Sequence, residues 1–150
     1  MALDKNGNVY IWGNGTYGEM GNYTTTSSNL PIKTTIKNGI QVSMGAGDIA
    51  ALTSEGVVWS WGRNTNGQHG INCTNNTAYP MKTVVNVTEL SKGGYHTIVK
   101  KSEGTVYAAG CNGGGRVATT STGNSTTYVK IMIPSTVTET NKVKYIKAGI

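Results

Sequence analysis

A pattern that recurs every 48 to 49 residues constrains this 150-residue chain more than any other feature. The run 51–62 aligns with the run 2–13 and again with the run 99–110. Glycine recurs at three positions of the unit, which are Gly7, Gly56 and Gly104, then Gly13, Gly62 and Gly110, then Gly18, Gly67 and Gly115. A repeat of this length is one supersecondary unit that buries its apolar face against its neighbours. The chain is therefore predicted to be an array of stacked units.

Each unit has the sequence pattern of β-structure. In the second unit, residues 49–53 and 57–61 flank a polar turn that ends in Gly56, which predicts a hairpin. Two further strands are expected at 80–85 and 87–91. Four short strands in about 49 residues match the size of one propeller blade. A short apolar run closing in glycine precedes each hairpin, at 40–45, 87–93 and 143–149.

The composition supports an all-β fold, because 21 glycines and only 13% charged residues favour strands and tight turns. Residues 1–150 are predicted to be a single region of three approximate units, 1–44, 45–92 and 93–150. A closed propeller with blades of this length needs roughly 200 to 390 residues. We therefore expect a partial propeller that belongs to a longer chain. The alternative is that copies assemble through open blade edges.

The second unit resembles a known repeat family. The string from Trp61 to Gly70, preceded by 52–56, is similar to the signature of the regulator of chromosome condensation (RCC1) repeat, and 93–97 resembles the strand that opens the next repeat. The resemblance covers the whole chain, although the first unit has Glu19 where the second has Gln68, and the third has Ala109 in place of the tryptophan. It implies an all-β fold of about three RCC1-like repeats, each a propeller blade of four antiparallel strands.

The same resemblance assigns structural roles to residues at equivalent positions of the units. Trp12 and Trp61 are expected to pack between blades, and His96 to satisfy a backbone hydrogen bond within a blade rather than to carry a proton. The full set of structural repeat positions is Gly7, Trp12, Gly13, Gly18, Gly21, Gly56, Trp59, Trp61, Gly62, Asn64, Gly67, Gln68, Gly70, His96, Gly104, Gly110 and Gly115.

Several patterns that look chemical have a structural explanation. Residues 45–50 and 13–18 fit a dinucleotide-binding glycine pattern, but neither opens a predicted helix, which that mechanism needs. His69 and Cys73 are only two ligands in a loop, and Cys73 and Cys111 have no CxxC companion, so no metal site is expected. The chain is therefore predicted to be non-enzymatic and to use no cofactor.

The composition also bears on the partner and the compartment. The net charge of +6 comes from scattered lysines, so nucleic acid is not the expected partner. No run is long and apolar enough to span a membrane, and no signal peptide is visible in this window. The compartment stays open between the cytoplasm and a bacterial cell surface or secreted location.

The leading functional hypothesis is a scaffold that binds a partner protein through loops that differ from blade to blade. These loops are predicted at 23–29, 73–79 and 119–128. Arg63, His69 and Asp48 are the candidate interaction residues. Two alternatives follow from the family resemblance: guanine-nucleotide exchange on a small GTPase, and a secreted or surface bacterial propeller that binds or inhibits an extracellular target.

Overall fold

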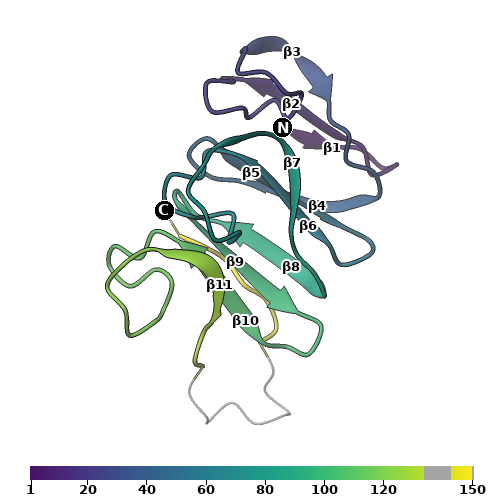
Figure 1. Ribbon diagram of the computed structural model, residues 1–150. Helices are drawn as coiled ribbons and strands as arrows, with labels where there is room; N and C mark the ends of the chain where they lie inside the picture. Colours follow the sequence, from purple (N-terminus) through teal and green to yellow (C-terminus); the bar gives the residue numbers. More distant parts are fainter. Residues whose placement is uncertain (134–142, 150) are drawn as a thin grey trace.

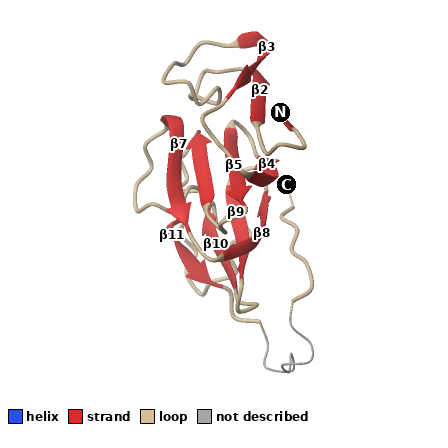
Figure 2. Cartoon of the chain, turned by 90° about the vertical axis from the view of Figure 1, so that its right-hand side faces the viewer, coloured by secondary structure: helices blue, strands red, loops and turns tan. Residues whose placement is uncertain are grey.

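The computed structural model describes residues 1–133 and 143–149, and all regular structure among them is β-strand (Figure 2). The strands are β1 (Ala2–Leu3), β2 (Val9–Gly13), β3 (Ser28–Lys33), β4 (Gly39–Met44), β5 (Asp48–Thr53), β6 (Val58–Gly62), β7 (Thr77–Val84), β8 (Val87–Lys92), β9 (His96–Lys101), β10 (Val106–Gly110) and β11 (Ser125–Lys130). No helix that could cross a membrane occurs in this part of the chain.

The strands form three antiparallel sheets that follow one another along the chain (Figure 1). The first sheet has the order β1-β2-β3, the second β4-β5-β6-β7 and the third β8-β9-β10-β11. This arrangement confirms the predicted all-β fold built from propeller blades. The sequence unit 45–92 supplies three strands to the second blade and the first strand, β8, to the third. Residues 134–142 and 150 of the third unit lie outside the described residues.

The predicted hairpin of the second unit is β5 and β6, with Ile49 opposite Trp61 and Ala51 opposite Trp59. Gly56 turns the chain with a φ of +74°, in the left-handed region that favours glycine. Gly62 ends β6 with a φ of +90°, and a Cβ atom there would lie 2.5 Å from the carbonyl oxygen of Gly47. The glycine after each hairpin therefore permits a left-handed backbone, and at Gly62 and Gly110 it also permits a close approach of the preceding turn.

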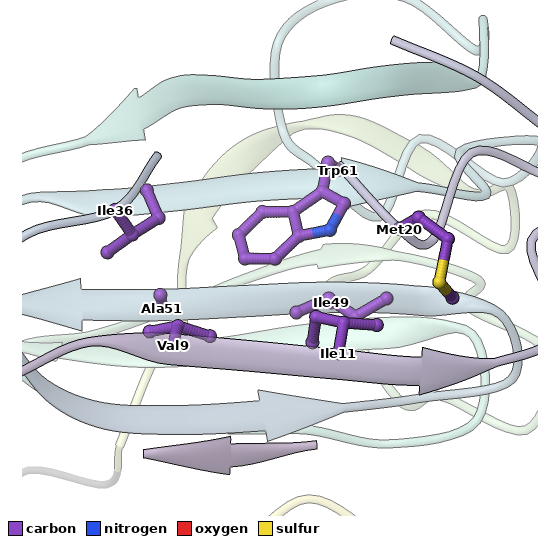
Figure 3. Packing of buried hydrophobic residues seen from close by; sticks show 7 residues of the cluster. All are labelled: Val9, Ile11, Met20, Ile36, Ile49, Ala51 and Trp61. Atoms are coloured by element: carbon purple, nitrogen blue, oxygen red, sulfur yellow. The ribbon is translucent and has the colours of Figure 1, made fainter. Parts of the chain in front are cut away.

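The core between the first two blades contains side chains from both sheets (Figure 3). Figure 3 shows Val9 and Ile11 of β2 packed beside Ile49 and Ala51 of β5, with the indole ring of Trp61 nearby. Burying large apolar side chains of this kind contributes about 1.5–3 kcal/mol each.

The second core lies between the second and third blades and uses the opposite face of the same strand. Ala50 and Leu52 of β5 pack with Leu90 of β8 and Val99 of β9. Every residue of β5 is buried. Because side chains alternate between the two faces of a strand, β5 contributes to both interfaces and holds three blades in one stack.

Trp61 joins the first two blades, as the sequence predicted for this position. Its side chain is fully buried, and its Nε1 donates a hydrogen bond of 2.8 Å to the carbonyl oxygen of Glu19 in the preceding blade. The equivalent Trp12 is 42% exposed among the described residues, so its expected packing between blades stays a prediction. The loop after β2 covers Trp61, and no described segment covers Trp12 in the same way.

The first strands of neighbouring blades are linked by side chains. Gln41 on β4 donates from Nε2 to the carbonyl oxygen of Leu90 at 2.9 Å, and its Oε1 accepts from the Leu90 N–H at 3.0 Å. Ser43 Oγ accepts from the N–H of Lys92 at 3.0 Å. Polar side chains of β4 thus satisfy backbone groups of β8 that face away from its own sheet.

The same pattern continues beyond β8. Glu89 accepts a hydrogen bond from the N–H of Ile146 at 3.1 Å, and Ser91 Oγ accepts one from the N–H of Ala148 at 2.9 Å. Glu89 and Ser91 occupy the positions of Gln41 and Ser43 in the repeat. Residues 143–149 therefore lie along β8 as β8 lies along β4, in agreement with the predicted third apolar run.

We expect Trp61→Ala to lower the free energy of unfolding by about 3–5 kcal/mol, because it removes a buried indole between two blades. Urea denaturation followed by circular dichroism measures this loss. Trp12→Ala is the matched control, since it changes the same repeat position at an exposed site. Equal losses for the two variants would contradict the role of Trp61 as an interblade residue.

Candidate protein-interaction face

One end of the blades is formed by long loops and short turns, which we call the loop face. It comprises the loops 14–27, 63–76 and 111–124, the strand positions 28–30, 77–79 and 125–127 that follow them, and the turns 45–47 and 93–95. Backbone hydrogen bonds join these segments across blades. The N–H of Ala46 donates to the carbonyl oxygen of Gly94 at 2.9 Å, and the N–H of Asn72 donates to that of Thr126 at 2.7 Å.

An asparagine organises the loop of the second blade. The Asn64 N–H donates to Asn76 Oδ1 at 2.9 Å, its Nδ2 donates to the carbonyl oxygen of Cys73 at 3.0 Å, and its Oδ1 accepts from the His69 N–H at 2.9 Å. Because one buried residue is hydrogen-bonded to three points of the loop through its side chain and its backbone N–H, this part of the loop face is a structured surface despite its lack of strands.

The third blade repeats this arrangement around Asn112. Its N–H donates to Asn124 Oδ1 at 3.1 Å, and its Oδ1 accepts from the Val117 N–H at 2.9 Å. Asn112 stands 48 residues after Asn64. The organising contacts are therefore a property of the repeat, and the loops differ in the side chains that they present outward.

Arg63 lies near the middle of the loop face, between two tyrosine rings. Its Cζ atom is 5.0 Å from the centroid of Tyr17 in the first blade and 5.0 Å from that of Tyr95 in the third. Its Nε donates to Thr65 Oγ1 at 3.1 Å, and its backbone N–H donates to the carbonyl oxygen of Gly47 at 2.8 Å. Stacking on two rings restricts the guanidinium and gives it cation–π stabilisation.

A second aromatic pair lies where the loop of the first blade meets the second blade. The rings of Tyr23 and Tyr79 are stacked, with centroids 5.2 Å apart and an interplanar angle of 16°. Tyr23 is 73% exposed and Tyr79 is 42% exposed. The Tyr23 N–H donates to the carbonyl oxygen of Ala78 at 2.7 Å, which holds the loop on β7.

Two of the three candidate interaction residues do not reach the surface. Asp48 and His69 are fully buried, whereas Arg63 is partly exposed. Asp48 begins β5 at the interface with the third blade, and His69 lies beneath its own loop. The assignment of Asp48 and His69 as partner contacts is therefore wrong, because neither side chain is accessible to a partner.

Asp48 instead forms a buried ion pair across the second interface. Lys92 at the end of β8 contacts the Asp48 carboxylate, and both side chains are fully buried. Lys92 Nζ also donates to Thr97 Oγ1 at 2.7 Å, and Thr97 Oγ1 donates to the carbonyl oxygen of Gln68 at 2.7 Å. Burial raises the pKa of Asp48, and the positive charges of Lys92 and Arg63 oppose that rise.

Burial and the nearby charge of Lys92 keep both histidines, His69 and His96, in the neutral form. Burial, assisted by the charge of Lys92, lowers the pKa of His69 to about 3. Burial also lowers the pKa of His96, with Arg116 and Lys92 contributing. Nδ1 of His96 has no hydrogen-bond partner among the described residues, so the backbone hydrogen bond expected of His96 is not formed at that atom. Cys73 and Cys111 are free, and residues 1–133 and 143–149 contain no cluster of three metal-ligating side chains.

The sequence reasoning missed the tyrosines of the loop face and the lysine of the ion pair. Tyr17, Tyr23 and Tyr95 lie in loops and turns that are otherwise rich in glycine, asparagine and threonine, and Tyr79 directly follows such a loop at the start of β7. These aromatic residues were an available signal. Lys92 ends an apolar run at the repeat position that Met44 occupies in the preceding unit. The sequence around Lys92 and Asp48 gives no indication that these two side chains meet.

The sequence matches one described repeat family. The regulator of chromosome condensation (RCC1) repeat matches at residues 6–52 and 55–99, which together make up more than half of the chain. A second description of this repeat matches residues 40–68. Comparison with curated proteins gives no significant match.

Three solved structures share the fold. Human WBSCR16 is 25% identical with a TM-score of 0.74, covering 88% of this chain and 36% of its own. Yeast RCC1 (Prp20) bound to Kap60 is 20% identical with a TM-score of 0.76, covering 98% and 37%. Prp20p from Saccharomyces cerevisiae, described with its binding to Gsp1p and histones, is 21% identical with a TM-score of 0.78, covering 98% and 38%. The chain thus spans less than two fifths of each.

We expect Lys92→Met to lower the free energy of unfolding by about 3–5 kcal/mol, because it leaves the Asp48 carboxylate buried without a counter-ion. Methionine is the residue at the equivalent position of the preceding blade, Met44. The double variant Asp48→Asn/Lys92→Met removes both charges and should recover much of this loss in the same urea titration. A double variant as unstable as Lys92→Met would contradict the ion-pair explanation.

The low pKa of His69 predicts a loss of stability in acid. The unfolded histidine titrates near pH 6.5 and the folded one near 3, so its contribution is complete above pH 6.5 and declines as the pH falls. Between pH 7 and pH 4 this amounts to about 3 kcal/mol. His69→Met, which introduces the residue found at Met20, should flatten the dependence of unfolding free energy on pH. An unchanged slope would contradict the buried neutral state of His69.

Proposed function

Because this chain belongs to the regulator of chromosome condensation (RCC1) repeat family, we propose that it acts as a non-enzymatic scaffold that binds a partner protein through the loop face. The observation that carries this proposal is the presence of exposed tyrosine and arginine side chains held by structured loops on three successive blades. Tyrosine and arginine are enriched among the residues that dominate binding energy at protein interfaces.

The stacked pair Tyr23 and Tyr79 is the strongest feature for this role. Two exposed aromatic rings lose little side-chain entropy on binding when they are already ordered against each other. Backbone hydrogen bonds place the loop of Tyr23 on β7, which carries Tyr79, so the pair bridges two blades. An ordered aromatic pair of this kind is suited to cover an apolar side chain of a partner.

Similar structures support a protein as the partner. Yeast RCC1 (Prp20) is described in complex with Kap60, and Prp20p with binding properties to Gsp1p and histones. The two Prp20 structures are only 20–21% identical in sequence to this chain. The names of their partners are therefore not carried over to it. Nucleotide exchange on a small GTPase and binding of an extracellular target remain predictions that no particular described residue favours.

The test uses residues that the repeat itself supplies. Tyr23→Asn/Tyr79→Thr introduces the residues found at the equivalent positions, Asn72 and Thr127, and asparagine tolerates the φ of +68° at Tyr23. Peptides selected for binding to the native protein from a displayed library should bind this variant at least about tenfold more weakly. Biolayer interferometry measures the affinities.

Leu30→Ser is the matched control, since Leu30 is an exposed apolar residue at the repeat position of Tyr79 in the first blade and does not belong to the stacked tyrosine pair. It should leave the affinities of the selected peptides unchanged. Peptides that lose affinity with Leu30→Ser but not with the tyrosine double variant would place binding elsewhere and contradict the proposal.

A further inference from the structure

The Arg63 side chain has the geometry of a receptor for a carboxylate. Tyr17 and Tyr95 cover its guanidinium from two sides, and Thr65 occupies its Nε–H. Among the described residues, neither Nη atom of Arg63 has a hydrogen-bond partner. Arg63 also takes no part in the two ion pairs, which join Asp48 to Lys92 and Glu89 to Lys100. The unoccupied edge presents the parallel N–H groups that bind a carboxylate in a bidentate manner.

The surroundings of Arg63 decide which anion fits. Within the loop face, Arg63 and Arg116 are the only arginine or lysine residues, His69 is buried and neutral, and Glu19 is the only acidic residue. Nucleic acid binding rests on several cations that neutralise successive phosphates. A surface with two separated arginines amid neutral polar residues suits a single carboxylate better than a polyanion.

The nearest charges leave Arg63 available for this role. Glu19 is buried, and its Oε2 accepts from the Tyr17 N–H at 2.7 Å. Asp48 is buried and paired with Lys92, so its charge is already compensated. Neither carboxylate forms an ion pair with Arg63, and an external carboxylate would be the first to do so.

The backbone around Arg63 favours a side-chain carboxylate over a chain terminus. Terminal carboxylates are usually captured by nests of free backbone N–H groups. Here the N–H groups of Ala46, Gly47 and Arg63 all donate to carbonyl oxygens within the protein. Recognition therefore depends on the guanidinium fork and the tyrosine rings rather than on the backbone.

We propose that Arg63, clamped between Tyr17 and Tyr95, binds the carboxylate of an aspartate or glutamate side chain in the partner protein. This inference rests on the proposed function and adds the chemistry that the partner must present. The tyrosine rings flank the bound carboxylate, and they hold the guanidinium in the binding orientation before the partner arrives, which lowers the entropy lost on binding.

The experiment titrates the native protein with acetyl-Gly-Asp-Gly-amide and follows the Arg63 Nε–H signal by NMR. We expect a saturable shift of this signal, no shift with acetyl-Gly-Asn-Gly-amide, and a smaller effect with acetyl-Gly-Gly, which carries only a terminal carboxylate. The Arg63→Lys variant keeps the charge but loses the fork, so the aspartyl peptide should bind it at least about tenfold more weakly, as judged from the tyrosine ring signals.

Arg116→Gln is the matched control, because it removes the other arginine of the loop face and should leave the titration unchanged. Equal shifts with the aspartyl and asparaginyl peptides would overturn the proposal. So would tighter binding of oligothymidylate, which would identify a phosphate site, or of acetyl-Gly-Gly, which would identify a site for chain termini. Library peptides that depend on Tyr23 and Tyr79 but not on Arg63 would overturn this inference and leave the scaffold function intact.

Discussion

The burial of one strand on both faces is the constraint on which this structure depends. β5 has no exposed residue: Ile49 and Ala51 contact the first blade, and Ala50 and Leu52 contact the third. A single blade would leave both of these faces in water, and apolar burial of about 25 cal/mol per Å² is what the fold gains from stacking. The blades are therefore stable as neighbours, and the loops at their ends inherit fixed relative positions.

Fixed positions explain how scattered loop residues form one surface. Tyr17, Arg63 and Tyr95 come from three different blades, and none is near another in the sequence. Their contact requires only that each blade keep its place against the next. A rigid scaffold with variable loops is a common way to build a binding face, because changes in the loops do not disturb the core.

The buried ion pair of Asp48 and Lys92 is not repeated at the equivalent positions of the neighbouring blades. The position of Lys92 is Met44 in the preceding blade, and the position of Asp48 is His96 in the next. A buried ion pair adds less net stability than its attraction implies, since both ions lose their hydration.

The sequence by itself determined the fold class, the repeat length, the hairpin around Gly56 and the interblade role of Trp61, because each depends on local periodicity or on a glycine that only a particular turn requires. Tertiary structure decided which polar residues are accessible. Asp48, His69 and Arg63 are all polar residues close to glycines in the sequence. The next blade and the overlying loop bury Asp48 and His69, whereas Arg63 emerges between two tyrosines. Burial of Asp48 depends on what the next blade places against it, and its partner Lys92 lies 44 positions further along the chain (92 − 48).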